Sequence, residues 1–89
     1  MATINFTSHL QRYLDCPPLT VSAATVHEAL SEAFAGNVRL AGYILDDQQR
    51  LRKNVVIFVD GQQIQDRRHL SDRLGPNSEI YILQALSGG

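Results

Sequence analysis

The chain has 89 residues, of which 44% are hydrophobic and 19% charged, and its formal net charge is −1. These values are typical of one soluble globular domain, and the length leaves no room for a second. Because the charge is near neutral, we expect no electrostatic attraction of the whole domain to nucleic acid or an anionic membrane. No stretch has the pattern of a signal peptide or a membrane span. A single cysteine, Cys16, excludes an internal disulfide and fits a reducing compartment, so we expect a cytoplasmic protein.

The N-terminal part of the sequence predicts two strands. Ile4, Phe6 and, after a slip in the alternation, Leu10 fall on one apolar face at about strand spacing. Residues 15–18 contain two prolines, which cannot donate to a strand ladder and therefore break the pattern. The alternation of apolar and polar residues resumes over residues 19–22 and predicts a second strand. The two strands are close in sequence, so we expect them to form a hairpin.

A helix is predicted next. Its apolar residues recur at helical spacing and form one stripe: Val26, Ala29, Leu30, Ala33 and Phe34. Thr25 and Glu28 have the spacing of a capping box, in which the threonine hydroxyl accepts from the glutamate N–H. Gly36 stands where a left-handed C-terminal cap is expected.

The middle of the chain is less regular. Apolar residues at Val38, Ala41, Ile44 and Leu45 predict a short second helix, followed by a turn at residues 46–49.

Strand signals return in the last third. Residues 55–59 are β-branched and aromatic, and Asp60-Gly61 followed by residues 62–64 predicts a hairpin with one short arm. Residues 65–78 are polar, with two apolar anchors at Leu70 and Leu74 and a turn over residues 75–78. A final strand is predicted over residues 79–86.

This order of elements predicts an α+β domain in which one main helix packs on one face of a mixed sheet. The first and last strands are expected to lie side by side and parallel at its centre.

Side chains with catalytic chemistry are scattered. His9, His27 and His69 have no partners at metal-ligand spacing, and no nucleophile elbow or phosphate-binding loop is present, so neither a metal site nor a self-contained enzyme is expected. The basic residues Arg50, Arg52 and Lys53 form either a solvated loop or a contact for an acidic partner, and Arg67-Arg68 is interpreted in the same way.

The strands place apolar side chains on both faces of the sheet. Phe58 on one strand and Tyr81 and Leu83 on the last lie opposite the face that packs on the helix. Since the uncovered face of such a sheet is normally polar, these residues predict a protein-docking surface. The alternative is that residues 37–54 cover them.

The sequence closes with Gly88-Gly89 directly after the last predicted strand. Glycine has no Cβ, so such a tail can enter a channel too narrow for other residues and present its carboxylate to a partner's active site. The alternative is an ordinary frayed terminus. We therefore expect a domain over residues 1–86 and a flexible tail over residues 87–89.

Together these features resemble the ubiquitin-like sulfur carriers of the MoaD/ThiS family, which includes the molybdopterin synthase small subunit and the thiamine- and cysteine-pathway carriers. Residues 58–64 are similar to the family's Val-Asn-Gly hairpin. Residues 75–89 are similar to its closing turn, strand and small-residue tail ending in Gly-Gly. The turn at residues 76–78 and Gln84, where many members have proline, depart from the pattern. The long segment 37–54 brings the chain closer to the molybdenum-cofactor and cysteine branches.

The resemblance implies a β-grasp (ubiquitin-like) fold and a sulfur carrier rather than an enzyme. An E1-like adenylyltransferase of the MoeB/ThiF type would use ATP and magnesium to adenylate the Gly89 carboxylate, and no cofactor would be bound to the chain itself. A sulfurtransferase would supply the sulfur that forms a thiocarboxylate, and a synthase would accept it for cofactor or cysteine biosynthesis.

The resemblance also assigns roles to residues. Gly89 would carry the chemistry and Gly88 would give clearance. The predicted partner contacts are Phe58, Tyr81, Leu83, Leu86 and Ser87. Two alternatives stay open: a protein modifier joined through Gly89 to lysines of its targets, and a plain interaction module with an idle terminus.

Overall fold

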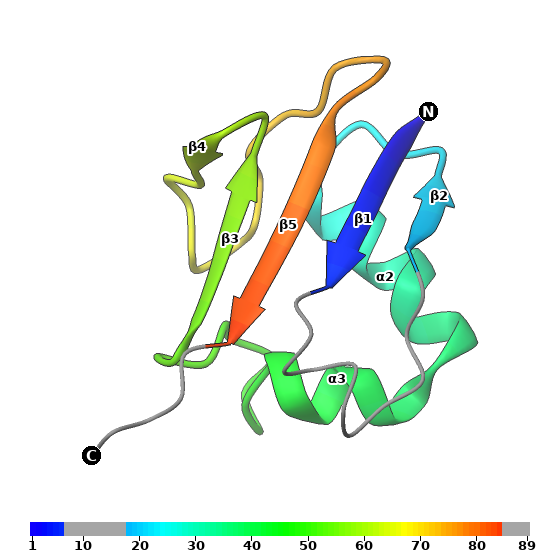
Figure 1. Ribbon diagram of the computed structural model, residues 1–89. Helices are drawn as coiled ribbons and strands as arrows, with labels where there is room; N and C mark the ends of the chain where they lie inside the picture. The colour runs from blue at the N-terminus through cyan, green and yellow to red at the C-terminus, as the bar shows by residue number, and fades with distance from the viewer. Residues whose placement is uncertain (7–17, 85–89) are drawn as a thin grey trace.

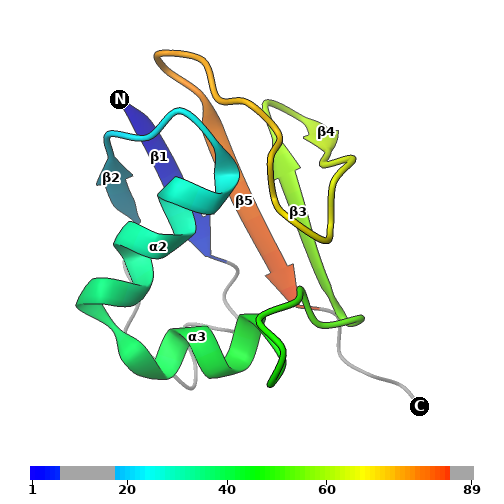
Figure 2. The same cartoon turned by 180° about the vertical axis from the view of Figure 1, so that it is seen from behind.

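The structure is a computed structural model that describes residues 1–6 and 18–84. Five strands form one sheet: β1 (Ala2–Phe6), β2 (Leu19–Val21), β3 (Val55–Val59), β4 (Gln62–Gln63) and β5 (Glu79–Gln84). Their spatial order is β2-β1-β5-β3-β4, so the last strand lies at the centre (Figure 1). Two helices, α2 (Val26–Gly36) and α3 (Val38–Ile44), lie against the same face of the sheet (Figures 1 and 2).

Pairing of the strands gives a mixed sheet. β1 pairs antiparallel with β2 and parallel with β5, and β5 pairs antiparallel with β3. The predicted N-terminal hairpin and the parallel pair at the centre are therefore confirmed. The β3–β4 hairpin turns through Asp60 (φ 51°) and Gly61 (φ 85°), the two left-handed residues that a tight turn of this kind requires.

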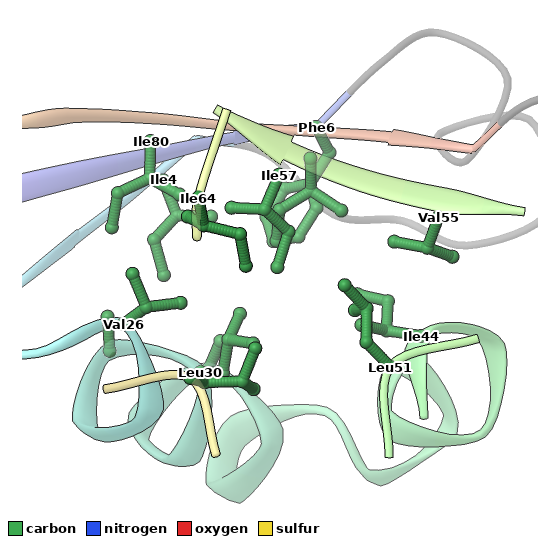
Figure 3. Close-up of a cluster of buried hydrophobic side chains, with 14 of the residues drawn as sticks. Ile4, Phe6, Val26, Leu30, Ile44, Leu51, Val55, Ile57, Ile64 and Ile80 are labelled. Atoms are coloured by element: carbon green, nitrogen blue, oxygen red, sulfur yellow. The ribbon is translucent and has the colours of Figure 1, made fainter. Parts of the chain in front are cut away.

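The hydrophobic core lies between the sheet and the two helices. Side chains from the inner faces of the strands meet side chains of both helices and of Leu51 (Figure 3). The fully buried large side chains are Ile4, Val21, Val26, Leu30, Leu40, Ile44, Val55, Ile57, Ile80 and Ile82. Every strand except the two-residue β4 contributes to this set, which makes the sheet and helices one packing unit.

Helix α2 begins as the sequence predicts. The Thr25 hydroxyl oxygen accepts a hydrogen bond from the backbone N–H of Glu28 at 3.2 Å, which satisfies one of the free donors of the first turn. The predicted stripe faces the sheet, with Phe34 partly buried at its end.

The predicted left-handed cap at Gly36 is wrong. Gly36 is the last helical residue, and Asn37, with φ −153°, separates α2 from α3. The Asn37 N–H donates to the Phe34 carbonyl at 3.2 Å, and α3 starts at the next residue. The chain therefore turns straight from α2 into the second helix. The short helix predicted from residues 38–45 is confirmed, as α3.

Two carboxylates organise the polar segment between β4 and β5. Asp72 accepts from the N–H groups of Gln65 and Asp66, and Asp66 in turn accepts from those of His69 and Ser71. These bonds replace the ladder or helix that the segment lacks. Both predicted apolar anchors are confirmed: Leu70 is buried, and Leu74 is partly buried and packs against the core.

Neither of the two helices described is long and apolar enough to span a bilayer. The predictions for His9, Leu10, Cys16 and residues 85–89 lie outside the described residues.

Candidate functional site

Strand β5 presents two different faces. Ile80 and Ile82 are fully buried against the helices, whereas Tyr81 is 47% exposed and Leu83 36% exposed on the opposite face. Side chains alternate along a strand, so the same six residues build part of the core and part of the outer surface.

Strand β3 extends this surface. Phe58 lies opposite Tyr81 and Val56 lies opposite Leu83 in the antiparallel register, and both β3 side chains are half-buried. Directly opposed residues on one face are about 5 Å apart, so the four side chains form one contiguous group. We call Val56, Phe58, Tyr81 and Leu83 the outer patch. The structure thus brings together the three docking residues predicted within the described chain, and it adds Val56.

No described element covers the outer patch. Helix α3, which arises from the segment that the alternative interpretation placed over these side chains, packs beside α2 on the other face (Figures 1 and 2). Its Leu40 and Ile44 are buried in the core. The alternative is therefore wrong, because α3 lies on the inner face of the sheet together with α2.

Polar groups border the outer patch on the side of β1. The Asn5 side-chain amide donates to the Ile80 carbonyl at 3.3 Å and to Glu79 Oε1 at 3.4 Å. An apolar centre with a polar border is the usual composition of a protein–protein contact surface.

The position of the outer patch relative to the chain end is set by β5. Its last residue, Gln84, pairs with Val55 at the start of β3, and Leu83 of the outer patch directly precedes it. The sequence then continues for the residues 85–89, so the patch and Gly88-Gly89 are separated by only a few residues. The roles predicted for Leu86, Ser87, Gly88 and Gly89 lie outside the described residues.

The basic residues before β3 have unequal roles. Arg52 Nε donates to the Gly42 carbonyl at 2.9 Å, and the Arg52 carbonyl accepts from the Arg67 guanidinium at 2.9 Å. Arg52 therefore links the loop to α3, and Arg67 links it to the segment after β4. These two side chains are not simply solvated, which was one of the two interpretations of the sequence. Arg50 and Lys53 are exposed and line a surface cavity of about 530 Å³.

Asp46 begins the same loop. Its Oδ1 accepts from the N–H groups of Arg50 at 2.9 Å and Gln48 at 2.8 Å. The Arg50 N–H is the main cause that lowers the pKa of Asp46, so this carboxylate stays ionised and holds the predicted turn.

A polar network that sequence reasoning missed fixes the start of β5. Ser78 is only 2% exposed; its hydroxyl donates to Asp60 Oδ2 at 2.8 Å and accepts from the Gly75 N–H at 2.7 Å. Asp60 Oδ1 accepts from the Glu79 N–H at 2.9 Å. That N–H, followed by the Ser78 hydroxyl, lowers the pKa of Asp60. The turn dipeptide Asp60-Gly61 was the only available sequence signal, and it does not indicate a partner 18 residues away.

The remaining polar features of the described residues are a surface cavity and two exposed histidines. A cavity of about 340 Å³ between the β3–β4 hairpin and the loop at Asp72 and Arg73 is lined mainly by polar side chains. His27 and His69 are exposed, and the described residues contain no group of three metal-ligating side chains.

Solved structures share this architecture over nearly the whole chain. SAMP1 from Haloferax volcanii superimposes with a TM-score of 0.84 at 18% identity, covering 99% of this chain and 98% of its own. CysO from Mycobacterium tuberculosis gives 0.80 at 17% identity, over 97% of this chain and 100% of its own. The matched chain of the Amycolatopsis orientalis BexX/CysO complex gives 0.77 at 16% identity, with full coverage of both chains. These similarities show that the fold is the α+β, ubiquitin-like β-grasp, as the sequence predicts.

No protein family model matches the sequence, and no curated protein matches it significantly.

Proposed function

We propose that this chain is a sulfur carrier whose Gly89 carboxylate is adenylated, converted to a thiocarboxylate and presented to a sulfur-accepting synthase. The observation that carries the proposal is the outer patch, which no described element covers, on the strand that leads to Gly88-Gly89. A β-grasp domain needs only one sheet face for its core, so apolar side chains on the other face support partner binding.

The chemistry requires activation because a carboxylate is a poor acyl donor. An E1-like adenylyltransferase would transfer AMP from ATP, with magnesium, to the Gly89 carboxylate and release pyrophosphate. The outer sulfur of a persulfide on a sulfurtransferase would then displace AMP and form an acyl disulfide. A thiol would cleave the S–S bond of this intermediate, which releases the thiocarboxylate and leaves a disulfide on the thiol side. Gly88 would give the tail clearance in the partner's channel, since a residue without a Cβ has the smallest cross-section. The outer patch, with Leu86 and Ser87, would hold the chain while Gly89 reacts.

Partner binding is supported by the BexX/CysO structure, in which a chain of this fold is crystallised with another protein.

A second candidate function is protein modification through the same Gly89. It is favoured by the similarity to SAMP1, a small archaeal modifier protein. The two functions share the adenylation step and differ in whether sulfur or a lysine amine displaces AMP.

The decisive experiment is intact mass spectrometry of the full chain after incubation with its E1-like enzyme, ATP, magnesium, a sulfurtransferase and cysteine. We expect a mass gain of one sulfur for one oxygen, located on Gly89. Lysine-linked adducts on other proteins without this gain would favour the modifier, and an unchanged mass would support the plain interaction module.

Two variants test the tail. Removal of Gly88-Gly89 should abolish the sulfur gain, and Gly88→Ala should slow it. Gly42→Ala is the matched control, because it adds the same methyl group to a glycine of α3 that has open space around it. If Gly88→Ala and Gly42→Ala react equally fast, clearance at residue 88 is not required.

A further inference from the structure

Glu79 is the only charged residue in the five strands of the described sheet. It is the first residue of β5, and parity places it on the outer face with Tyr81, opposite the buried Ile80. Residues two apart along a strand are separated by about 7 Å. The exposed carboxylate of Glu79 therefore stands at one end of the outer patch, beside the half-exposed Tyr81.

Part of this carboxylate is left for a partner outside the chain. The Asn5 amide donates to Oε1 of Glu79 at 3.4 Å, whereas Oε2 makes no hydrogen bond or ion pair within the part of the chain that the structure describes. The charged groups nearby are engaged elsewhere. Asp60 accepts from the Glu79 N–H, and the Met1 amine donates to the Pro76 carbonyl.

The basic loop before β3 is too far away to neutralise Glu79. Lys53 is two residues before Val55, which pairs with Gln84, the last residue of β5. Glu79 is the first residue of that strand, and the two ends of its six residues are about 17 Å apart. Exposed charges at this separation are largely screened, since the Debye length is about 8 Å at physiological ionic strength.

We propose that the outer patch docks a protein surface that carries an arginine, whose guanidinium pairs with Glu79 and stacks on the Tyr81 ring. Arginine fits this place better than lysine, because a planar guanidinium can hydrogen-bond a carboxylate and lie on an aromatic ring at the same time. The other side chains of the outer patch would contact apolar groups at the centre of the partner's surface. This inference rests on the proposed function for the identity of the partner, the E1-like enzyme.

The same charge disfavours a second copy of this chain as the occupant. Two outer faces packed together would bring two Glu79 carboxylates into one interface, and the described strands of the two copies would supply no cation. A carboxylate removed from water without a partner is costly. Glu79 therefore selects for a cationic partner and against self-association.

The test is isothermal titration calorimetry of the full chain against the purified E1-like enzyme of the same organism, without ATP. We expect Glu79→Gln to weaken binding about fivefold, because one charge pair is lost. Glu79→Arg should weaken it at least about thirtyfold, because it sets two cations against each other. Raising the salt concentration should weaken binding of the unmodified chain more than binding of Glu79→Gln, a difference that a purely structural role would not produce.

Glu32→Arg is the matched control. Glu32 is exposed on α2, which lies on the other face of the sheet, so this variant makes the same change of charge away from the outer patch. It should bind like the unmodified chain. Thermal melts show whether each variant folds, and Glu79→Gln, which keeps the size of the side chain, decides the matter if Glu79→Arg does not fold.

Equal binding of the unmodified chain and the Glu79 variants, equal losses for Glu79→Arg and Glu32→Arg, or no binding of the unmodified chain would each overturn the proposal. So would a dimer in sedimentation velocity that Tyr81→Ala dissociates, because the outer patch would then belong to a second copy. Mass spectrometry of the same proteins with ATP and a sulfur donor tests the proposed function separately. Binding that depends on Glu79, without sulfur on Gly89, would support the arginine contact and overturn the carrier function.

Discussion

At the scale of single residues, the buried hydroxyl of Ser78 is the contact on which the start of β5 depends. It joins the Gly75 N–H to the Asp60 carboxylate, and Asp60 itself holds the Glu79 N–H. We expect Ser78→Ala to lower the free energy of unfolding by about 1–3 kcal/mol, because the partners of a buried hydroxyl are left unsatisfied. Urea denaturation measures this loss. Ser22→Ala, at an exposed serine, should change stability by less than about 0.5 kcal/mol, and equal losses would contradict the assignment.

Asp66 gives the molecule an acid-sensitive contact. The Ser71 hydroxyl, followed by the N–H of His69, lowers the pKa of Asp66 from its ordinary value of 3.8 to about 2. Because the folded-state pKa is lowered, the carboxylate stabilises the fold fully above about pH 4, and this contribution is lost as the pH falls towards 2.

The corresponding prediction concerns Asp66→Asn. It should lower the melting temperature at neutral pH, and the difference from the unmodified chain should shrink steadily between pH 4 and pH 2. Thermal melts followed by circular dichroism across this range measure the difference. Asp47→Asn is the control, since Asp47 is exposed and has no hydrogen bond in the described chain. A constant difference at all pH values would contradict the proposed role of the carboxylate.

At the scale of elements, β5 has separate inner and outer roles, so its outer face can be altered without opening the core. We expect Tyr81→Ala to lower kcat/KM for adenylation of Gly89 about thirtyfold, or about 2 kcal/mol, as for a central aromatic contact in an interface. The melting temperature should change little, because Tyr81 is half exposed. Val38→Ala removes apolar surface from an 81% exposed position on α3 and should leave the reaction unchanged. Equal effects of the two variants would place docking elsewhere.

The elements also show what the sequence could and could not predict. Periodicity and capping predicted α2 from Thr25 onwards, and strand parity separated Tyr81 from Ile82, because these signals are local. The junction at Gly36 was mispredicted because its conformation depends on where α3 packs. Ser78 was missed because its burial depends on Asp60, which a hairpin and a long polar segment separate from it in sequence. The site residues 86–89 were predicted from the tail composition and a family resemblance alone.

At the scale of the whole molecule, stability is concentrated in the centre of the sheet. Ile82 is fully buried and lies between Phe6 on β1 and Ile57 on β3. We expect Ile82→Ala to lower the free energy of unfolding by about 2–5 kcal/mol, a large part of the total for a domain of this size. Leu83→Ala removes a comparable volume from the next, exposed residue and should have a much smaller effect. Chemical denaturation of both variants measures the difference, and similar losses would show that the outer patch also supports the fold.

The central position of β5 has a consequence for biosynthesis. Because the last described strand lies between β1 and β3, a nascent chain that still lacks it has a gap in the middle of its sheet. The partner strand of β1 lies some 75 residues downstream, so the core can close only after β5 has been synthesised. A chain interrupted before β5 would have neither a closed core nor an outer patch. The same strand therefore completes both the core and the outer patch.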